Sequence, residues 1–205
     1  MLHILGFGSP KAPDGVLRGM FAARKSVFVD LLKWDVPVID GRFEVDQFDD
    51  EHATYLVLTD RAGAHLGSTR LLPTMRPHIL DSFYADLCEE APPRGPDIAE
   101  ITRFCLDRRL RAAGRRQVRD TLVTALVDHA LATGIAGYSA IAELGWFQQI
   151  LGFGWRCMPL GLPRTIEGQT LAALIIEIED ATPRRLAAAG IRAVAALGGE
   201  VRDAA

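Results

Sequence analysis

The sequence predicts an α/β (α+β) protein, a three-layer αβα sandwich in which helices cover both faces of a mixed central sheet. Three observations predict this class. Runs of strand-forming residues alternate along the chain with stretches whose apolar residues recur every three or four positions. The 205 residues, 49% of them hydrophobic, are enough for a substantial core. No internal repeat and no low-complexity linker interrupts them, so we expect a single domain over residues 1–205.

Each element follows from its residue pattern. Strands are predicted where β-branched and aromatic residues are bounded by glycine, proline or aspartate, and helices where an apolar stripe repeats at three to four residues. The predicted strands are residues 2–6, 53–59, 65–72, 98–107, 135–142, 153–160 and 171–179. The predicted helices are residues 17–31, 79–88, a segment containing 118–130, 143–151 and 183–197. This order favours a mixed sheet covered by helices.

The composition excludes several classes of function. The net charge of −3 provides no general field for nucleic acid or for an anionic membrane. No run reaches the roughly 18 apolar residues of a membrane-spanning helix, and the first residues lack the basic segment of a secretory signal. The cysteines Cys88, Cys105 and Cys157 are too far apart for a zinc site or a disulfide framework. We therefore expect a cytoplasmic protein with no metal, no nucleic-acid partner and no membrane contact.

Two arginines occupy positions that are otherwise apolar. Arg24 lies on the apolar stripe of the helix over residues 17–31, and Arg70 shares a strand face with Leu66 and Leu72. A charge in such a place either extends along the surface to water or binds a partner at the edge of the core.

An acidic run lies between these two arginines. Six carboxylates fall within twelve residues, and Arg42 is the positive charge among them. They are Asp40, Glu44, Asp46, Asp49, Asp50 and Glu51. A solvated loop and a cation-binding wall, with Phe43 and Phe48 as aromatic faces, both fit this pattern.

Two later segments suggest a site for chemistry. In an ideal pleat Glu100 and Arg103 point to opposite faces of their strand, and a β-bulge would bring them to one side. Residues 108–116 are rich in arginine and precede a helix. This segment is either an anion site at a helix N-terminus or a plain basic turn.

These segments together resemble a known family. Residues 111–115 are similar to the pantetheine- and pyrophosphate-binding turn of the GCN5-related N-acetyltransferase (GNAT) fold. The wider pattern resembles the acyl-homoserine-lactone synthases (LuxI-type autoinducer synthases), which are built on that fold. The matching positions are Arg24, Phe28, Trp34, Asp46, Asp49, Arg70, Glu100, Arg103 and Phe104. The match covers roughly residues 1–160, and the part from about residue 160 is variable in the family.

The resemblance implies a two-step reaction without a cofactor, in which S-adenosylmethionine is a substrate. Its amine attacks an acyl thioester on acyl carrier protein or coenzyme A, and its carboxylate then closes a lactone and releases 5′-methylthioadenosine. The catalytic residues implied are Glu100 as base, with Arg103 and Asp46. Substrate binding is implied for Arg24, Phe28, Trp34, Asp46, Asp49, Arg70, Arg103 and Phe104, the aromatic rings through cation–π contact and the arginines by fixing carboxylates.

The acyl donor has two further candidate sites. An acyl pocket is expected from Ala142, Trp146, Phe147, Ile150 and Leu151, although the same residues suit packing of a helix on the sheet. A docking face for an acidic carrier protein is expected from Arg108, Arg109, Arg111, Gly114 and Arg115.

Two other functions fit parts of the sequence. Another small N-acyltransferase that uses acyl-coenzyme A would explain the glycine-containing turn, but not Trp34, Asp46, Asp49 and Glu100 together. A non-catalytic module that binds a nucleoside or an acyl ligand is the second alternative, and the intact Glu100 and Arg103 count against it.

Overall fold

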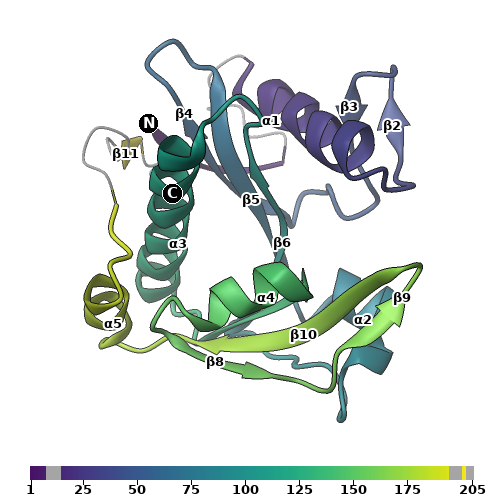
Figure 1. Ribbon diagram of the computed structural model, residues 1–205, viewed down its shortest axis with the longest axis vertical. Helices are drawn as coiled ribbons and strands as arrows, with labels where there is room; N and C mark the ends of the chain where they lie inside the picture. The colour runs from purple at the N-terminus through teal and green to yellow at the C-terminus, as the bar shows by residue number, and fades with distance from the viewer. Residues whose placement is uncertain (8–14, 194–199, 202–205) are drawn as a thin grey trace. The chain divides into compact units, whose positions relative to one another are not determined.

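The computed structural model describes residues 1–7, 15–193 and 200–201, which divide into two compact units (Figure 1). The first unit contains residues 1–70 and 103–125, with the described residues of 193–205. The second contains residues 71–102 and 126–192. Strands β5 and β6 and helix α3 contribute residues to both units. The single domain expected over residues 1–205 stays a prediction.

The strands of the first unit follow the order β11-β1-β4-β5-β6. They are β1 (Leu2–Gly6), β4 (Thr54–Thr59), β5 (His65–Pro73), β6 (Ile98–Leu106) and β11 (Glu200–Val201). Strand β1 runs antiparallel to β4, with Leu2 opposite Leu58, and parallel to β11. Helix α1 (Val16–Arg24) continues directly into a π-helical turn, η1 (Lys25–Leu31). The hairpin of β2 (Val38–Ile39) and β3 (Phe43–Glu44) lies beside α1 (Figure 1).

The two faces of strand β5 carry different helices, which makes the first unit three-layered. Gly67 faces α3 (Ala112–Thr133) so closely that a Cβ there would lie 2.6 Å from Cγ1 of Val118. Arg70 is three residues further along and therefore points to the other face, where its charge partner Asp49 also binds Arg24 at the end of α1. Helices α1 and α3 thus cover opposite faces of the same strands.

The second unit repeats this layering with its own elements. Its strand order is β5-β6-β7-β10-β8, with β9 paired to β10, and β6 and β7 are parallel. Tyr138 on β7 donates from its hydroxyl to the carbonyl of Leu126 on α3. Ile141 points to the other face and packs against buried Leu80 and Leu87. The elements are α2 (Ile79–Phe83), η2 (Ala85–Leu87), β7 (Gly137–Glu143), α4 (Leu144–Leu151), β8 (Arg156–Pro159), β9 (Arg164–Ile166), β10 (Gln169–Glu177) and α5 (Thr182–Ala188).

The predicted fold class is confirmed, and the differences lie at element boundaries. The predicted helix over 79–88 divides at Tyr84 into α2 and the 3₁₀ turn η2. Strand β9 was not expected. The last helix ends at Ala188, and residues 194–197 of its predicted range lie outside the described residues. Helix α3 already begins at Ala112, so Gly114 lies in its first turn and not in a preceding loop. Of the described helices, none is long and apolar enough to cross a membrane.

His65, the first residue of β5, provides a test by pH. Burial is the main cause that lowers its pKa to about 4, and its Nε2 lies 2.9 Å from Oγ of Ser68. Because the unfolded chain binds this proton near pH 6.5, the free energy of unfolding should fall by about 3 kcal/mol as pH drops from 6.5 to 4. Urea unfolding of wild type and of His65→Leu at several pH values measures the free energy of unfolding, which should depend less steeply on pH in the variant. The same pH dependence in both proteins would contradict a buried neutral imidazole.

Candidate active site

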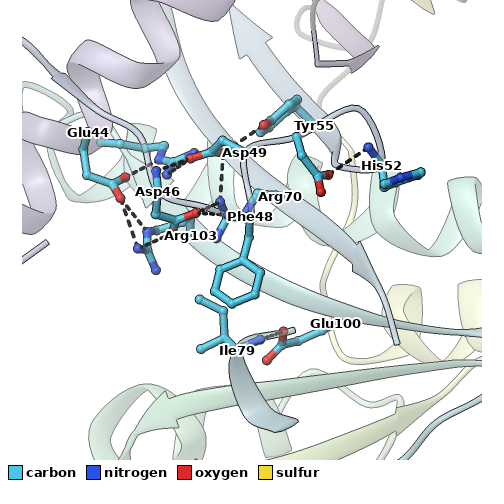
Figure 2. A network of polar contacts seen from close by, with 12 residues as sticks. Glu44, Asp46, Phe48, Asp49, His52, Tyr55, Arg70, Ile79, Glu100 and Arg103 are labelled. Carbon is cyan, nitrogen blue, oxygen red and sulfur yellow. Dashed lines mark hydrogen bonds and ion pairs between the residues drawn. The ribbon is translucent and has the colours of Figure 1, made fainter. Parts of the chain in front are cut away.

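Three arginines and three carboxylates form one buried network in the first unit (Figure 2). Arg24 donates from Nε to Glu44 and from Nη1 and Nη2 to Asp49, at 2.8 and 2.9 Å. Arg70 makes the same forked contact with Asp46, at 2.6 and 3.0 Å, and its Nη1 lies 2.8 Å from Asp49. Such charge-assisted, bidentate pairs are stronger than hydrogen bonds between neutral side chains.

Arg103 closes this network from strand β6. Its Nη2 donates to Glu44 at 3.1 Å and to Asp46 at 2.7 Å. Its backbone φ of 51° is left-handed, which is rare for a residue with a side chain and interrupts the regular pleat of the strand. The sequence suggested a β-bulge in this strand. In the structure the irregular backbone lies at Arg103 itself.

A stacked aromatic pair lies against Arg103. The rings of Phe28 and Trp34 are 4.7 Å apart and inclined by 20°. The guanidinium carbon of Arg103 lies 5.6 Å from the first ring and 5.7 Å from the second, within cation–π range. The π-helical turn η1 carries Phe28 towards Trp34, whose backbone N–H donates to the carbonyl of Phe28. The ring faces expected to hold a substrate cation therefore hold an arginine in this structure.

Asp49 is the centre of the network's electrostatics. Its carboxylate also accepts from Oη of Tyr55 and from the backbone N–H of Asp46, both at 2.8 Å. Burial alone would raise its pKa, but the hydrogen bonds and charge of Arg24, with the charge of Arg70, hold that pKa well below its usual range. Burial likewise opposes the charge of Arg24, and the bonds to Asp49 and Glu44 outweigh it and raise the pKa of Arg24. Asp49 and Arg24 are therefore both charged at neutral pH.

The side chains of the network differ in their exposure to solvent. The side chains of Arg24, Glu44, Asp49 and Arg70 are 0–1% exposed, whereas those of Asp46 and Arg103 are 5% and 9% exposed. The first four are closed off from solvent, and the last two keep some exposed surface. Glu44 was not among the predicted site residues. Its sequence signal was its place in the acidic run, which did not distinguish it from its five neighbours.

Glu100 lies in the second unit and has a defined structural contact there. It is fully buried, and its two oxygens accept from the backbone N–H groups of Ile79 and Leu80, each at 2.8 Å (Figure 2). These are the first two residues of α2, whose N–H groups have no partner within the helix. Glu100 therefore anchors the start of α2 through both carboxylate oxygens.

The remaining predicted residues have mixed environments. Ala142, Phe147 and Ile150 are buried in the second unit, whereas Leu151 is 42% exposed. Trp146 is half-buried, with its ring edge-on to Phe153 at 5.8 Å. Phe104 is half-buried on β6. This arrangement is what packing of α4 requires, and these residues stay candidates for an acyl pocket.

The arginines expected to dock the donor lie at the start of α3. Arg108, Arg109, Arg111 and Arg115 are exposed. Arg109 is held by Asp107 and Arg108 donates to the carbonyl of Ser26 at 3.2 Å. A pocket of about 600 Å³ opens here, lined by Gly19, Ala22, Ala23, Ser26, Val27, His65, Asp107, Arg108 and Arg109.

The cysteines do not suit nucleophilic chemistry. Burial raises the pKa of Cys105 to about 12 and that of Cys157 to about 11, and thiolate is the reactive form. The described residues include no group of three or more His, Cys, Asp or Glu side chains arranged for a metal ion.

Comparison with known proteins identifies the family of the chain. The autoinducer synthase family model matches residues 13–186. An acyl-homoserine-lactone synthase of Ralstonia solanacearum is 32% identical over 95% of this chain and 96% of its own length. An isovaleryl-homoserine lactone synthase of Bradyrhizobium diazoefficiens is 31% identical over 89% of this chain and 82% of its own.

A solved structure shows the same fold. BjaI, a CoA-dependent acyl-homoserine lactone synthase solved with SAM and isopentyl-CoA, superposes with a TM-score of 0.84 at 29% identity, covering 93% of this chain and 90% of BjaI. It has also been solved with MTA. The chain therefore belongs to the autoinducer synthase family and is a transferase of the acyl-homoserine-lactone synthase type.

Proposed function

We propose that this enzyme binds S-adenosylmethionine beside Trp34, Asp46 and Arg103 and acylates its amine from acyl-coenzyme A. The observation that supports this most is the buried network, which assembles Arg24, Asp46, Asp49, Arg70 and Arg103 from four separate segments. The likeness to a CoA-dependent synthase solved with both ligands supports the same pair of substrates.

S-adenosylmethionine carries an ammonium, a sulfonium and a carboxylate, and the proposed site has a partner for each. Asp46 attracts the cationic groups, and Arg103 binds the carboxylate in a charge-assisted hydrogen bond. The nucleoside is proposed to stack on Trp34, whose side chain is half-buried and stacked on Phe28. The fully buried Arg24, Glu44, Asp49 and Arg70 hold these groups in place.

The acyl transfer needs a base because an amine at neutral pH is protonated. In the proposed step Glu100, directly or through a water molecule, takes one proton from the ammonium, and the freed electron pair on nitrogen attacks the thioester carbonyl carbon. The second proton of the nitrogen passes to the departing sulfur, so that an amide forms and the donor leaves as a free thiol. The methionine carboxylate then attacks the carbon attached to sulfur, which closes the lactone and releases 5′-methylthioadenosine.

The exposed arginines at the start of α3 are the proposed contact for the donor. Coenzyme A presents phosphates that suit Arg108, Arg109, Arg111 and Arg115, with Gly114 leaving room in the first turn. An acidic acyl carrier protein would use the same charges. The rates of lactone synthesis from acyl-coenzyme A and from acyl carrier protein, each carrying the same acyl chain, distinguish these two donors.

The function is tested by expressing the protein in a bacterium that makes no such lactones and analysing an extract of the medium by mass spectrometry. The expected result is a series carrying the homoserine-lactone fragment, with 5′-methylthioadenosine formed by the purified protein. The masses give the acyl length and oxidation state. Acyl transfer to another amine, without 5′-methylthioadenosine, would instead indicate a different N-acyltransferase.

Trp34→Ala is expected to weaken S-adenosylmethionine binding about tenfold, because it removes the stacking face and the support of Phe28. Isothermal titration without acyl donor measures the dissociation constant. Trp146→Ala is the matched control, since it removes the same side chain from α4. Unchanged affinity in Trp34→Ala would make Trp34 a packing residue only.

A further inference from the structure

The pocket near the start of α3 is separate from the buried ion network. The nine residues that line its volume of about 600 Å³ all belong to the first unit. Gly19 and Ala22 of α1 form part of its wall, whereas Arg24 of the same helix points into the network. Because each helical residue turns by about 100°, Arg24 lies about 140° from Gly19 and about 160° from Ala22 around the helix axis. The pocket and the network therefore lie on nearly opposite sides of α1.

The wall that α1 presents to the pocket consists of small side chains. Gly19, Ala22 and Ala23 recur at the spacing of one helical face, and Ser26 follows in the first turn of η1. A Cβ added at Gly19 would meet no neighbouring atom within 4 Å, so the space beside it is open. Small-molecule sites measure about 300–1,000 Å³, and this pocket lies within that range.

The pocket has an excess of positive charge. The carboxylate of Asp107 is paired with Arg109. Arg108 donates at 3.2 and 3.4 Å to the carbonyl and hydroxyl oxygens of Ser26, which carry no charge. Within the described part of the chain, no carboxylate therefore balances the charge of Arg108. An anionic group bound beside it would supply the counter-charge.

His65 adds a polar ring to the wall of the pocket. Its Nε2 lies beside Oγ of Ser68, and its Nδ1 is buried without a partner among the described residues. The lowered pKa of His65, about 4, keeps the ring neutral at pH 7. Buried polar atoms are nearly always hydrogen-bonded. The wall therefore favours a ligand with hydrogen-bonding groups over a purely apolar one such as an acyl chain.

We propose that this pocket holds the adenosine end of coenzyme A, with the neighbouring phosphates bound by Arg108. The thioester end of the donor must reach the amine of S-adenosylmethionine, whose proposed site lies on the network side of α1. The phosphates are assigned to the arginines near the start of α3. The part of the donor that remains for a pocket beside those arginines is the adenosine, whose planar base carries hydrogen-bond donors and acceptors on its edge.

The pocket would also select the donor. Acyl carrier protein presents its acyl chain on phosphopantetheine, which has no adenosine and gains no contact in the pocket. Coenzyme A gains such contacts, and binding energy that is equal in the ground state and the transition state lowers KM without changing kcat. This inference rests on the proposed function, because it requires acyl-coenzyme A to be the donor.

The test uses the full-length enzyme and two donors with the same acyl chain, acyl-coenzyme A and acyl-phosphopantetheine. Gly19→Leu fills the pocket and should raise the KM for acyl-coenzyme A about tenfold, while the KM for acyl-phosphopantetheine stays the same. The variant should unfold at or above the wild-type midpoint, because leucine favours a helix more than glycine does. The control Ala132→Leu adds the same side chain at an exposed position of α3 outside the pocket and should change neither KM.

Direct binding is measured with adenosine 3′,5′-bisphosphate, the part of coenzyme A that phosphopantetheine lacks. Titration calorimetry without acyl donor should show that this probe binds to wild type and to Ala132→Leu, and about tenfold more weakly to Gly19→Leu. Equal affinity of all three proteins would overturn the inference, because the probe would then bind outside the pocket.

The kinetic outcomes separate the inference from the function on which it depends. A wild-type enzyme that makes no lactone from any donor overturns the proposed function and the inference with it. Lactone synthesis from acyl carrier protein alone, or an unchanged KM for acyl-coenzyme A in Gly19→Leu, overturns only the use of this pocket by adenosine. An equal rise of KM for both donors in Gly19→Leu also overturns it, because the pocket would then hold the pantetheine arm.

Discussion

Replacing Glu100 by glutamine is expected to slow lactone synthesis by about 100-fold or more while S-adenosylmethionine still binds. The reason is the loss of the group that takes the proton from the attacking amine, which in enzymes contributes on this scale. Single-turnover acyl transfer measures the rate, and titration calorimetry measures the binding.

The structural contact of Glu100 requires a matched control. Glutamine has one acceptor oxygen, so its amide nitrogen would oppose one of the N–H groups of Ile79 and Leu80. Ile79→Pro removes one of those N–H groups and keeps the carboxylate. Proline suits the first helical position, and His78 before it is already extended, with φ −139° and ψ 173°.

These two variants separate proton transfer from anchoring of α2. If Glu100 is the base, lactone synthesis is slow in Glu100→Gln and close to the wild-type rate in Ile79→Pro. If the rate falls equally in both variants, the carboxylate acts by holding α2. Near-normal turnover of Glu100→Gln would remove Glu100 from the mechanism altogether.

Asp49→Asn is expected to lower the free energy of unfolding by about 3–5 kcal/mol, the usual cost of removing one partner from a buried ion pair. Asp49 neutralises Arg24 and Arg70 at once, and both guanidinium groups are 0–1% exposed. An asparagine keeps the shape but leaves two buried cations with one fewer carboxylate. Chemical denaturation at neutral pH measures the loss.

The control for this variant is Asp30→Asn, which breaks a solvent-exposed pair with Lys25. That change should cost less than about 1 kcal/mol, because exposed pairs are screened by water. A similarly small cost for Asp49→Asn would contradict a network that stabilises the fold through buried charge.

The effect of Asp49 should also depend on pH. Its pKa is lowered in the folded protein, so its contribution is complete above the unfolded value near 4 and is lost as pH falls towards the folded value. The stability difference between wild type and Asp49→Asn should therefore shrink below about pH 4. A difference that stays constant with pH would show that the stability difference does not come from the charge of Asp49.

The order of the elements and the family resemblance can be predicted from the sequence alone. Periodicity located the strands and most helices, because a buried strand or helix face must be apolar at a period of two or 3.6 residues. The spacing of Arg24, Phe28 and Trp34, with Glu100 and Arg103 further on, carried the family resemblance. Boundaries such as the break at Tyr84 were missed because local patterns do not set where tertiary packing ends a helix.

The partners of the buried charges, in contrast, depend on the tertiary structure. Periodicity marked Arg24 and Arg70 as unusual, but left open whether they reach water or bind a partner. Their carboxylates lie 20 to 25 positions away in the chain, and nothing in a local pattern separates Glu44 from the other acids of its run. Arg103 was expected on the opposite face from Glu100, and its left-handed φ breaks the pleat on which that expectation rested.

For Glu100, too, the sequence predicts one part of its role and the packed structure sets another. Its motif indicated a base, whereas its contact with α2 and its place beside Ser139 depend on strand register and on a helix 20 residues away. Hydrogen bonds and ion pairs join whichever groups the packed backbone brings within about 3 Å, so their partners are set by the fold as a whole. Apolar periodicity depends only on the residues of each segment, and for that reason it can be recognised in the sequence.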